Sequence, residues 1–240
     1  MIYVVLALIG VLSGMISGIV GTGSSIILLP ILAYIFGAKL AVPIMAIAAI
    51  MGNISRVMLW RHELNIKAFL LFTSVGIPAA VLGANTLWVM PAKVSNICIG
   101  LFFILLIPLR HFAKRKGLKL NNFHLVLAGA LLGYLTGLVF STGPLLLPVF
   151  SGFGLTKGAL LATEAASSFA LYASKSTAFG TLGVLKSEVI LAGFLVGLSL
   201  MFGNYFGKLF VLNISERVFN LLLDGMLLFA GLSMLWAAIS

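Results

Sequence analysis

The chain has 240 residues, of which 62 % are hydrophobic and only 8 % are charged. A soluble domain carries about 25 % charged residues, so this composition excludes a soluble enzyme, a disordered chain and a secreted disulfide scaffold. The net charge of +10 would suit nucleic acid, but the placement of the basic residues indicates membrane orientation instead, and no nucleic-acid partner is expected.

Ten continuous apolar runs predict an all-α polytopic membrane protein, with the lipid bilayer as its surroundings. They lie at residues 2–21, 24–37, 40–60, 66–90, 94–109, 123–140, 144–156, 158–182, 187–212 and 217–239. A full crossing needs about 20 apolar residues, and the apolar parts of two runs, 26–36 and 144–153, are shorter. We expect these two to be broken or re-entrant half-helices that end inside the membrane.

The two halves of the sequence resemble one another. Each half begins with a ladder of three glycines four residues apart: Gly10, Gly14 and Gly18, then Gly129, Gly133 and Gly137. A polar turn and a proline follow each ladder. We predict two transmembrane repeats, 1–109 and 123–240, joined by a basic linker at 110–122. Because each repeat has about five segments, an odd number, the second repeat is inverted in the membrane.

The basic residues predict the orientation. The linker carries five of them, so it is expected on the cytoplasmic side, which puts both termini outside. Eleven basic residues then lie inside: Arg56, Arg61, Lys67, Arg110, Lys114, Arg115, Lys116, Lys119, Lys157, Lys208 and Arg217. Only Lys39, Lys93 and Lys186 lie outside. The linker is also expected to contact anionic lipid headgroups.

The first polar turn consists of Gly21, Thr22, Gly23, Ser24 and Ser25. A half-helix is expected to begin near Ser24 or Ser25, since serine is a preferred N-cap residue. The first amide groups of such a helix are free and its dipole is positive there, so this end suits an anion.

The second polar turn consists of Ser141, Thr142, Gly143 and Pro144, and proline suits a first helical turn. Inverted symmetry would bring the two turns together near the midplane of the membrane, where they predict a binding site for a small oxyanion. The alternative is a pair of tight turns without a ligand. Pro30 and Pro148, a few residues further on, are expected to kink or end the short helices.

The glycine ladders themselves predict close helix packing rather than a homodimer motif. The sequence leaves both a monomer and an oligomer open.

Four polar residues inside the apolar runs are candidates for balancing charge. Lys175 and Glu164 are eleven residues apart on one helical face. Lys175 would pair with the anion, and Glu164 would pair with a lysine or carry a coupling proton. Asn53 and Arg56 lie in the third run, and Arg56 aligns with Lys175 between the repeats. The alternatives are that Glu164 and Arg56 lie near the cytoplasmic interface and that Lys175 reaches outward.

No metal, cofactor or enzymatic activity is expected. His62, His111 and His124 lack metal-ligand spacing, and Cys98 has no partner cysteine. A hydrolase would need a buried base beside Ser24. The sequence also contains no phosphate-binding loop of the ATPase kind. Asp224 and Asn204 are interpreted as isolated polar groups at helix contacts.

Together these motifs resemble the TauE/SafE family of sulfite and sulfonate transporters, also called the toluene sulfonate uptake permease family. The resemblance rests on both glycine patterns with their prolines, on the polar stretch 61–66 and on Gly203-x3-Gly207. It implies transport of small anions across the cell membrane, with sulfite, sulfonates or related organosulfur compounds as substrates. Together with the inverted repeats and the two polar turns, it predicts a secondary transporter with alternating access at a midplane site. Alternatives are a transporter or channel for another small solute, such as a carboxylate, and an intramembrane hydrolase.

Overall fold

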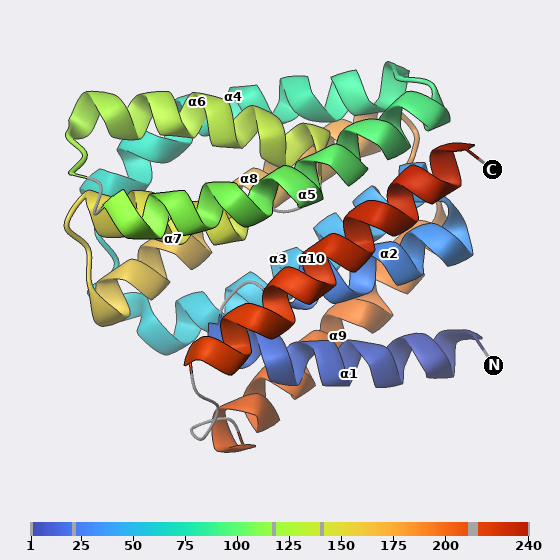
Figure 1. Cartoon of the computed structure of the whole chain (residues 1–240), viewed down its shortest axis with the longest axis horizontal. Helices are drawn as coiled ribbons and strands as arrows, with labels where there is room; N and C mark the ends of the chain where they lie inside the picture. Colours follow the sequence, from blue (N-terminus) through green and yellow to red (C-terminus); the bar gives the residue numbers. More distant parts are fainter. Residues whose placement is uncertain (1, 21–22, 117–118, 140–141, 211–215, 240) are drawn as a thin grey trace.

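The computed structural model describes residues 2–20, 23–116, 119–139, 142–210 and 216–239, and within them the chain forms ten α-helices (Figure 1). Their bounds are α1 Ile2–Val20, α2 Gly23–Phe36, α3 Ala38–Trp60, α4 Ile66–Val89, α5 Ala92–Lys116, α6 Asn122–Leu138, α7 Gly143–Gly152, α8 Lys157–Thr181, α9 Ser187–Phe210 and α10 Glu216–Ile239. A short 3₁₀ helix, η1, covers Arg61–Glu63. The expected all-helical class is confirmed.

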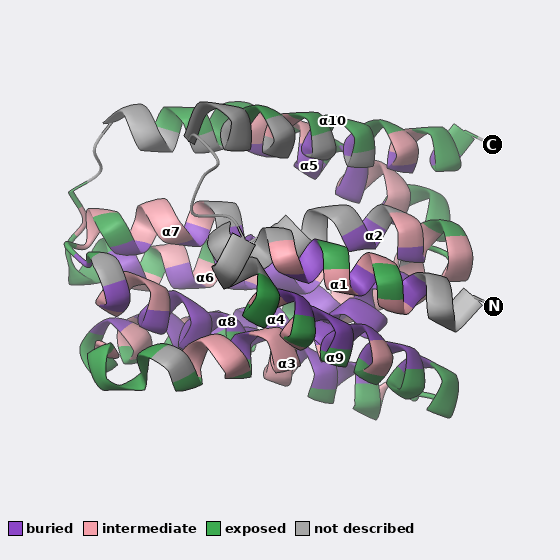
Figure 2. Ribbon diagram, turned by 90° about the horizontal axis from the view of Figure 1, so that it is seen from below, coloured by how far each residue is buried: buried purple, intermediate pink, exposed green. Residues whose placement is uncertain are grey.

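Among the described residues, four stretches are long and apolar enough to cross a membrane: Lys39–Met58, Ile66–Val89, Ala92–Leu109 and Ser187–Phe206. Shorter apolar stretches lie in α1, α6 and α10. Large apolar side chains such as Leu105, Phe194 and Trp236 are exposed on the outside of the bundle, and the buried residues gather in its middle (Figure 2). An apolar exterior of this kind is suited to lipid tails.

The two short helices expected from the sequence are present as α2 and α7. They have 14 and 10 residues, so they are about 21 and 15 Å long against a hydrocarbon core of about 30 Å. In both views α2 and α7 lie toward opposite ends of the bundle (Figures 1 and 2). α2 continues for six residues beyond Pro30 and α7 for four residues beyond Pro148, so neither proline ends its helix, and a kink at either proline stays a prediction.

The bundle has two distinct ends. α1 begins and α10 ends at one of them, whereas α5 ends and α6 begins at the other (Figure 1). We call these the terminal end and the linker end. η1 and the start of α8 are neighbours, because the Glu63 side chain lies against Gly158, and both lie at the linker end (Figure 1). Which end faces the cytoplasm stays a prediction.

α5 continues through the first seven residues of the predicted linker, as far as Lys116, although its stretch suited to crossing a membrane ends at Leu109. Arginine and lysine favour helix, and positive charge near a helix C-terminus is stabilised by the helix dipole, so the basic stretch extends α5 rather than ending it. Of the described part of the linker, the Leu120 amide donates to the Gly152 carbonyl at 2.8 Å, which ties it to the end of α7.

The glycine ladders are faces of close helix contact, as predicted. A Cβ atom added at Gly133 on α6 would lie 2.7 Å from the Cα of Gly76 on α4. One added at Gly14 on α1 would lie 2.9 Å from the Cα of Gly203 on α9. In both pairs the backbones touch, so only glycine fits at the contact.

We expect Gly133→Ala to lower the free energy of unfolding by about 1–3 kcal/mol, because the methyl group must push α4 away from α6. The matched control is Gly225→Ala on α10, where a Cβ atom would meet nothing within 4 Å. That change is expected to be neutral or slightly stabilising, since alanine favours helix over glycine. Thermal unfolding in detergent measures both, and equal stability of the two variants would contradict the packing assignment.

The contacts between helices recur when each helix number is shifted by five, with α10 followed by α1. The contact α1–α9 then corresponds to α6–α4, α2–α3 corresponds to α7–α8, and α3–α9 corresponds to α8–α4. The contacts α3–α8 and α5–α10 map onto themselves under the same shift. α3 and α8, one from each half, thus meet in the middle of the bundle.

Candidate functional site

Helix α8 places a row of polar side chains inside the bundle. Its buried polar residues are Thr163, Glu164, Ser167, Ser168, Lys175 and Ser176. In an apolar bundle such groups are expensive to bury and are usually functional. Two charged positions stand out along this helix, one at Lys175 and one at Glu164.

Lys175 is completely buried beside the break between α6 and α7. Its ammonium donates to the carbonyl oxygens of Thr136, at 2.8 Å, and Val139, at 3.3 Å. These carbonyls are among the last of α6, where the helix leaves acceptors without intrahelical donors and its dipole is negative. The alternative that Lys175 reaches outward to the interface is therefore wrong. The ring of Tyr172 lies 5.5 Å from the same ammonium, at a cation–π distance.

The break also holds two buried hydroxyl groups. The Thr136 hydroxyl donates to the Leu132 carbonyl at 2.6 Å, so the Thr142 hydroxyl that contacts it acts as the donor. Thr142 occupies the N-cap position of α7 without capping it by its side chain, and its carbonyl accepts from the amides of Leu145 and Leu146. Gly143 and Pro144 form the first turn of α7, whose dipole is positive at this end.

Of the first predicted turn, the structure describes the start of α2. This helix begins at Gly23, so Ser24 and Ser25 stand in its first turn, close to the start expected from the sequence. Gly21 and Thr22, and Ser141 of the second turn, lie outside the described residues. The meeting of the two turns stays a prediction.

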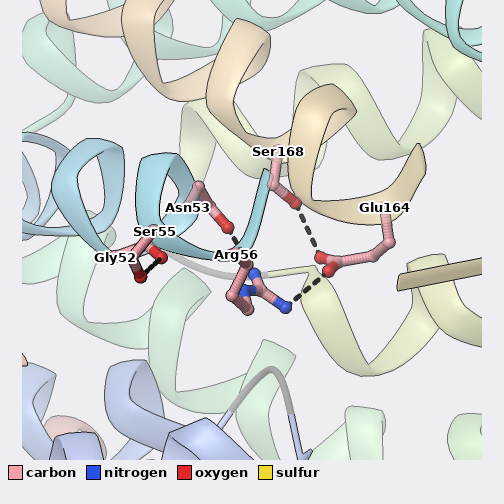
Figure 3. Close-up of polar contacts among 6 residues, drawn as sticks. All are labelled: Gly52, Asn53, Ser55, Arg56, Glu164 and Ser168. Atoms are coloured by element: carbon pink, nitrogen blue, oxygen red, sulfur yellow. Dashed lines mark hydrogen bonds and ion pairs between the residues drawn. The ribbon is translucent and has the colours of Figure 1, made fainter. Parts of the chain in front are cut away.

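The second charged position is an ion pair between α3 and α8 (Figure 3). An Nη atom of Arg56 lies 2.7 Å from Oε2 of Glu164, and the other Nη contacts Oδ1 of Asn53. Ser168, one turn after Glu164, donates to its Oε1 at 2.8 Å. The Glu164 side chain is 1 % exposed and that of Arg56 14 % exposed, so the pair is mostly shielded from water.

Sequence analysis grouped Glu164, Arg56 and Asn53 as charge-balancing candidates, and the structure brings them into contact. It separates them from Lys175, since eleven residues of α helix span about 16 Å. The polar row of α8 therefore has two charged centres, with Lys175 at the α6–α7 break and Glu164 nearer the linker end.

Comparison with protein families gives one match. The family model described as sulfite exporter TauE/SafE matches residues 6–234. The chain belongs to the TauE/SafE family. No curated protein and no solved structure matches it.

TauE/SafE is a transporter family and not an enzyme family, and membership implies membrane transport of sulfur anions. The resemblance drawn from the glycine ladders and polar turns is thus confirmed. Among the described residues, no cluster of three or more histidine, cysteine or acidic side chains is arranged to hold a metal ion.

The sequence did not single out Thr136, whose carbonyl and hydroxyl both lie at the α6–α7 break. A signal was present, because Thr136 in the second glycine ladder stands where Ser17 stands in the first, so both copies carry a hydroxyl group between two glycines. The interpretation of Asp224 as isolated is wrong, since its Oδ2 lies 2.8 Å from Nε2 of His111 and links α10 to α5. The two residues are far apart in sequence, which hides the pair.

Proposed function

We propose that this TauE/SafE protein is a secondary transporter of small sulfur oxyanions, sulfite or organosulfonates, which it binds at the α6–α7 break and moves by alternating access. The observation that carries the proposal is the buried ammonium of Lys175, held by two backbone carbonyls at that break. A buried cation beside a helix N-terminus attracts an anion strongly, because both act in a medium of low dielectric constant.

Binding of the oxyanion would give the Lys175 ammonium a stronger partner than the two carbonyl groups at the break. Two of the groups that Lys175 contacts at the break are neutral carbonyls, and an oxyanion would add a charge-assisted hydrogen bond. The Thr142 hydroxyl would turn from Thr136 toward the anion, and the Gly143 amide, the first of α7, would complete the site, since Pro144 has no amide hydrogen and Leu145 and Leu146 donate to the Thr142 carbonyl. Ser141 and Pro144 belong to the same turn.

The first turn would contribute the matching half of the site, with Gly21, Thr22, Gly23, Ser24 and Ser25. The proposal that the halves 1–109 and 123–240 are inverted repeats is supported by the helix contacts that recur under a shift of five. The half-helices α2 and α7, which lie toward opposite ends of the bundle, fit the same arrangement. Rocking of one half against the other would then expose the site to each side in turn.

The orientation follows from the charges. We place the linker end in the cytoplasm and the terminal end outside, in the cell membrane, because the basic side chains gather toward the linker end. The cationic end of α5 would then lie beside anionic lipid headgroups.

Counterflow in proteoliposomes tests this function. Vesicles loaded with unlabelled methanesulfonate or sulfite are expected to take up the labelled anion transiently and saturably, with acetate and alanine as rival solutes. Equal exchange of acetate would indicate a general carboxylate or anion transporter. Flux without saturation or counterflow would indicate a channel, and no flux of any sulfur anion through folded protein would contradict the proposal.

Thr142→Val tests the turn residues. It keeps the shape of the side chain but removes the hydroxyl group, so we expect the KM for sulfonate to rise about 10-fold, the value of one hydrogen bond to a charged group. Thr73→Val on α4 is the control, since this buried hydroxyl donates to Phe69 within its own helix. If Thr142→Val combined with Ser24→Ala leaves both affinity and flux unchanged, the turns are not the binding site.

A further inference from the structure

The Arg56–Glu164 pair joins the two halves of the chain inside the bundle. Arg56 comes from α3 and Glu164 from α8, and the two charges are 2.7 Å apart (Figure 3). Asn53 accepts a second hydrogen bond from the guanidinium, and Ser168 donates to the other carboxylate oxygen. Each charged group therefore has one neutral partner and one charged partner.

Stability alone does not account for this pair. Apolar side chains of similar volume stabilise a buried position as well as an ion pair does, or better. Ionisable groups within membrane helices usually belong to the transport path. A guanidinium is also the side chain best suited to bind an oxyanion, since its planar donors match two oxygen atoms. The carboxylate of Glu164 is itself such an oxyanion.

We propose that Arg56 is a second binding position for the transported sulfur oxyanion, and that Glu164 occupies it until it takes up a proton and gives way to the substrate. The inference rests on the proposed transport function and adds the coupling ion: the anion and the proton cross the membrane together.

The charges of the cluster balance in both states. Before binding, Arg56 carries +1 and Glu164 carries −1. After binding, one proton from the water at the linker end sits on Oε2 of Glu164, and one substrate monoanion sits on the guanidinium, so the sum is again zero. Without the proton the buried cluster would carry −1, which is strongly unfavourable in a medium of low dielectric constant.

Within the described residues, Arg56 is the charged side chain that contacts Glu164. The elements packed on α8 carry other titratable or cationic groups. Those near the linker end are all exposed: Arg61, His62 and Glu63 of η1, Lys67 of α4 and His124 of α6. Further away, Tyr134 of α6 bonds Thr86, Lys39 of α3 bonds the Trp88 carbonyl, and the sequence of α7 contains no such group. Glu164 is therefore the buried carboxylate for which proton uptake and anion binding are linked.

The two charged centres of α8 then act in sequence. Arg56, which is 14 % exposed, would be the first mostly buried cation that an anion from the linker end meets, and Lys175, about 16 Å along α8 from Glu164, would be the second. Glu164 prevents Arg56 from holding an anion permanently, since the carboxylate competes for it once the proton leaves.

Glu164→Gln separates coupling from transport. In proteoliposomes of the full chain with an inward proton gradient, the wild type is expected to accumulate labelled methanesulfonate at least 5-fold above the equilibrium level. The variant is expected to lose this accumulation while its counterflow stays within about 3-fold of wild type, because the neutral amide side chain leaves Arg56 available to the anion. Glu188→Gln, an exposed carboxylate at the start of α9, is the matched control and is expected to keep both activities.

Two outcomes overturn the inference without touching the proposed function. One is accumulation that persists in Glu164→Gln, and the other is loss of counterflow in a folded variant, which would show that the anion cannot be exchanged without the Glu164 carboxylate. Absence of wild-type counterflow would instead contradict the proposed function itself. A measurement on the wild type does not depend on the variant folding. In an unbuffered detergent solution, the wild-type protein is expected to take up about one proton for each methanesulfonate anion that it binds. No proton uptake on adding methanesulfonate would overturn the inference.

Discussion

Lys175→Met is expected to lower kcat/KM for sulfonate transport by about 100-fold, because it removes a charge-assisted hydrogen bond to the anion worth about 2.7 kcal/mol. The fold is expected to persist. Methionine has a similar length, and removing a charge from a fully buried position relieves its desolvation. The loss should therefore appear in transport and not in the unfolding temperature.

The control for this prediction is Lys186→Met, an exposed lysine just before α9, which is expected to leave transport unchanged. Both variants are measured by saturable counterflow and by thermal unfolding in detergent. Wild-type kcat/KM in a folded Lys175→Met protein would show that the buried ammonium serves only to bind the end of α6.

Arg56→Met is expected to lower the free energy of unfolding by about 3–5 kcal/mol at pH 8, because it leaves the Glu164 carboxylate buried without its cation. Arg56→Met combined with Glu164→Met should recover most of the stability, because apolar side chains then fill the same space without any charge.

Thermal unfolding of the single and double variants at pH 8 measures this coupling. Arg61→Met is the control, since Arg61 is exposed and bonds only the neighbouring His62 among the described residues, and it is expected to change stability by less than about 0.5 kcal/mol. Equal loss in Arg56→Met and in the double variant would contradict a buried charge pair.

Local patterns in the sequence predicted most of the helices of the fold. The apolar runs and the short stretches at 26–36 and 144–153 predicted the helices, because helix length and hydrophobicity are properties of contiguous residues. The glycine spacing predicted close packing, which Gly133 and Gly76 show. The extension of α5 through Lys116 was missed, because charge was taken as the end of the membrane segment although lysine and arginine also favour helix.

The geometry of the candidate site was harder to predict, because it depends on contacts between distant residues. Arg56 and Glu164 are 108 residues apart, and aligning the repeats set Arg56 opposite Lys175 rather than beside Glu164. The carbonyls that hold Lys175 come from the backbone of Thr136 and Val139, and every residue has a carbonyl, so no residue type marks them. Hydropathy and spacing selected Lys175, Glu164, Arg56 and Asn53 as candidates, but the packing of α8 against α3 and α6 determines which of them meet.

The most direct test of anion binding at the α6–α7 break is the labelling rate of a thiol placed there. Cys98 is the single cysteine of the chain, so Thr142→Cys in a Cys98→Ser background carries one thiol at the break. We expect methanesulfonate to slow the reaction of this thiol with N-ethylmaleimide, and acetate to leave the rate unchanged. The slowing is expected to be half-maximal at the methanesulfonate concentration equal to the KM of the same variant for transport. Transport that saturates with methanesulfonate while the labelling rate stays constant would contradict the account.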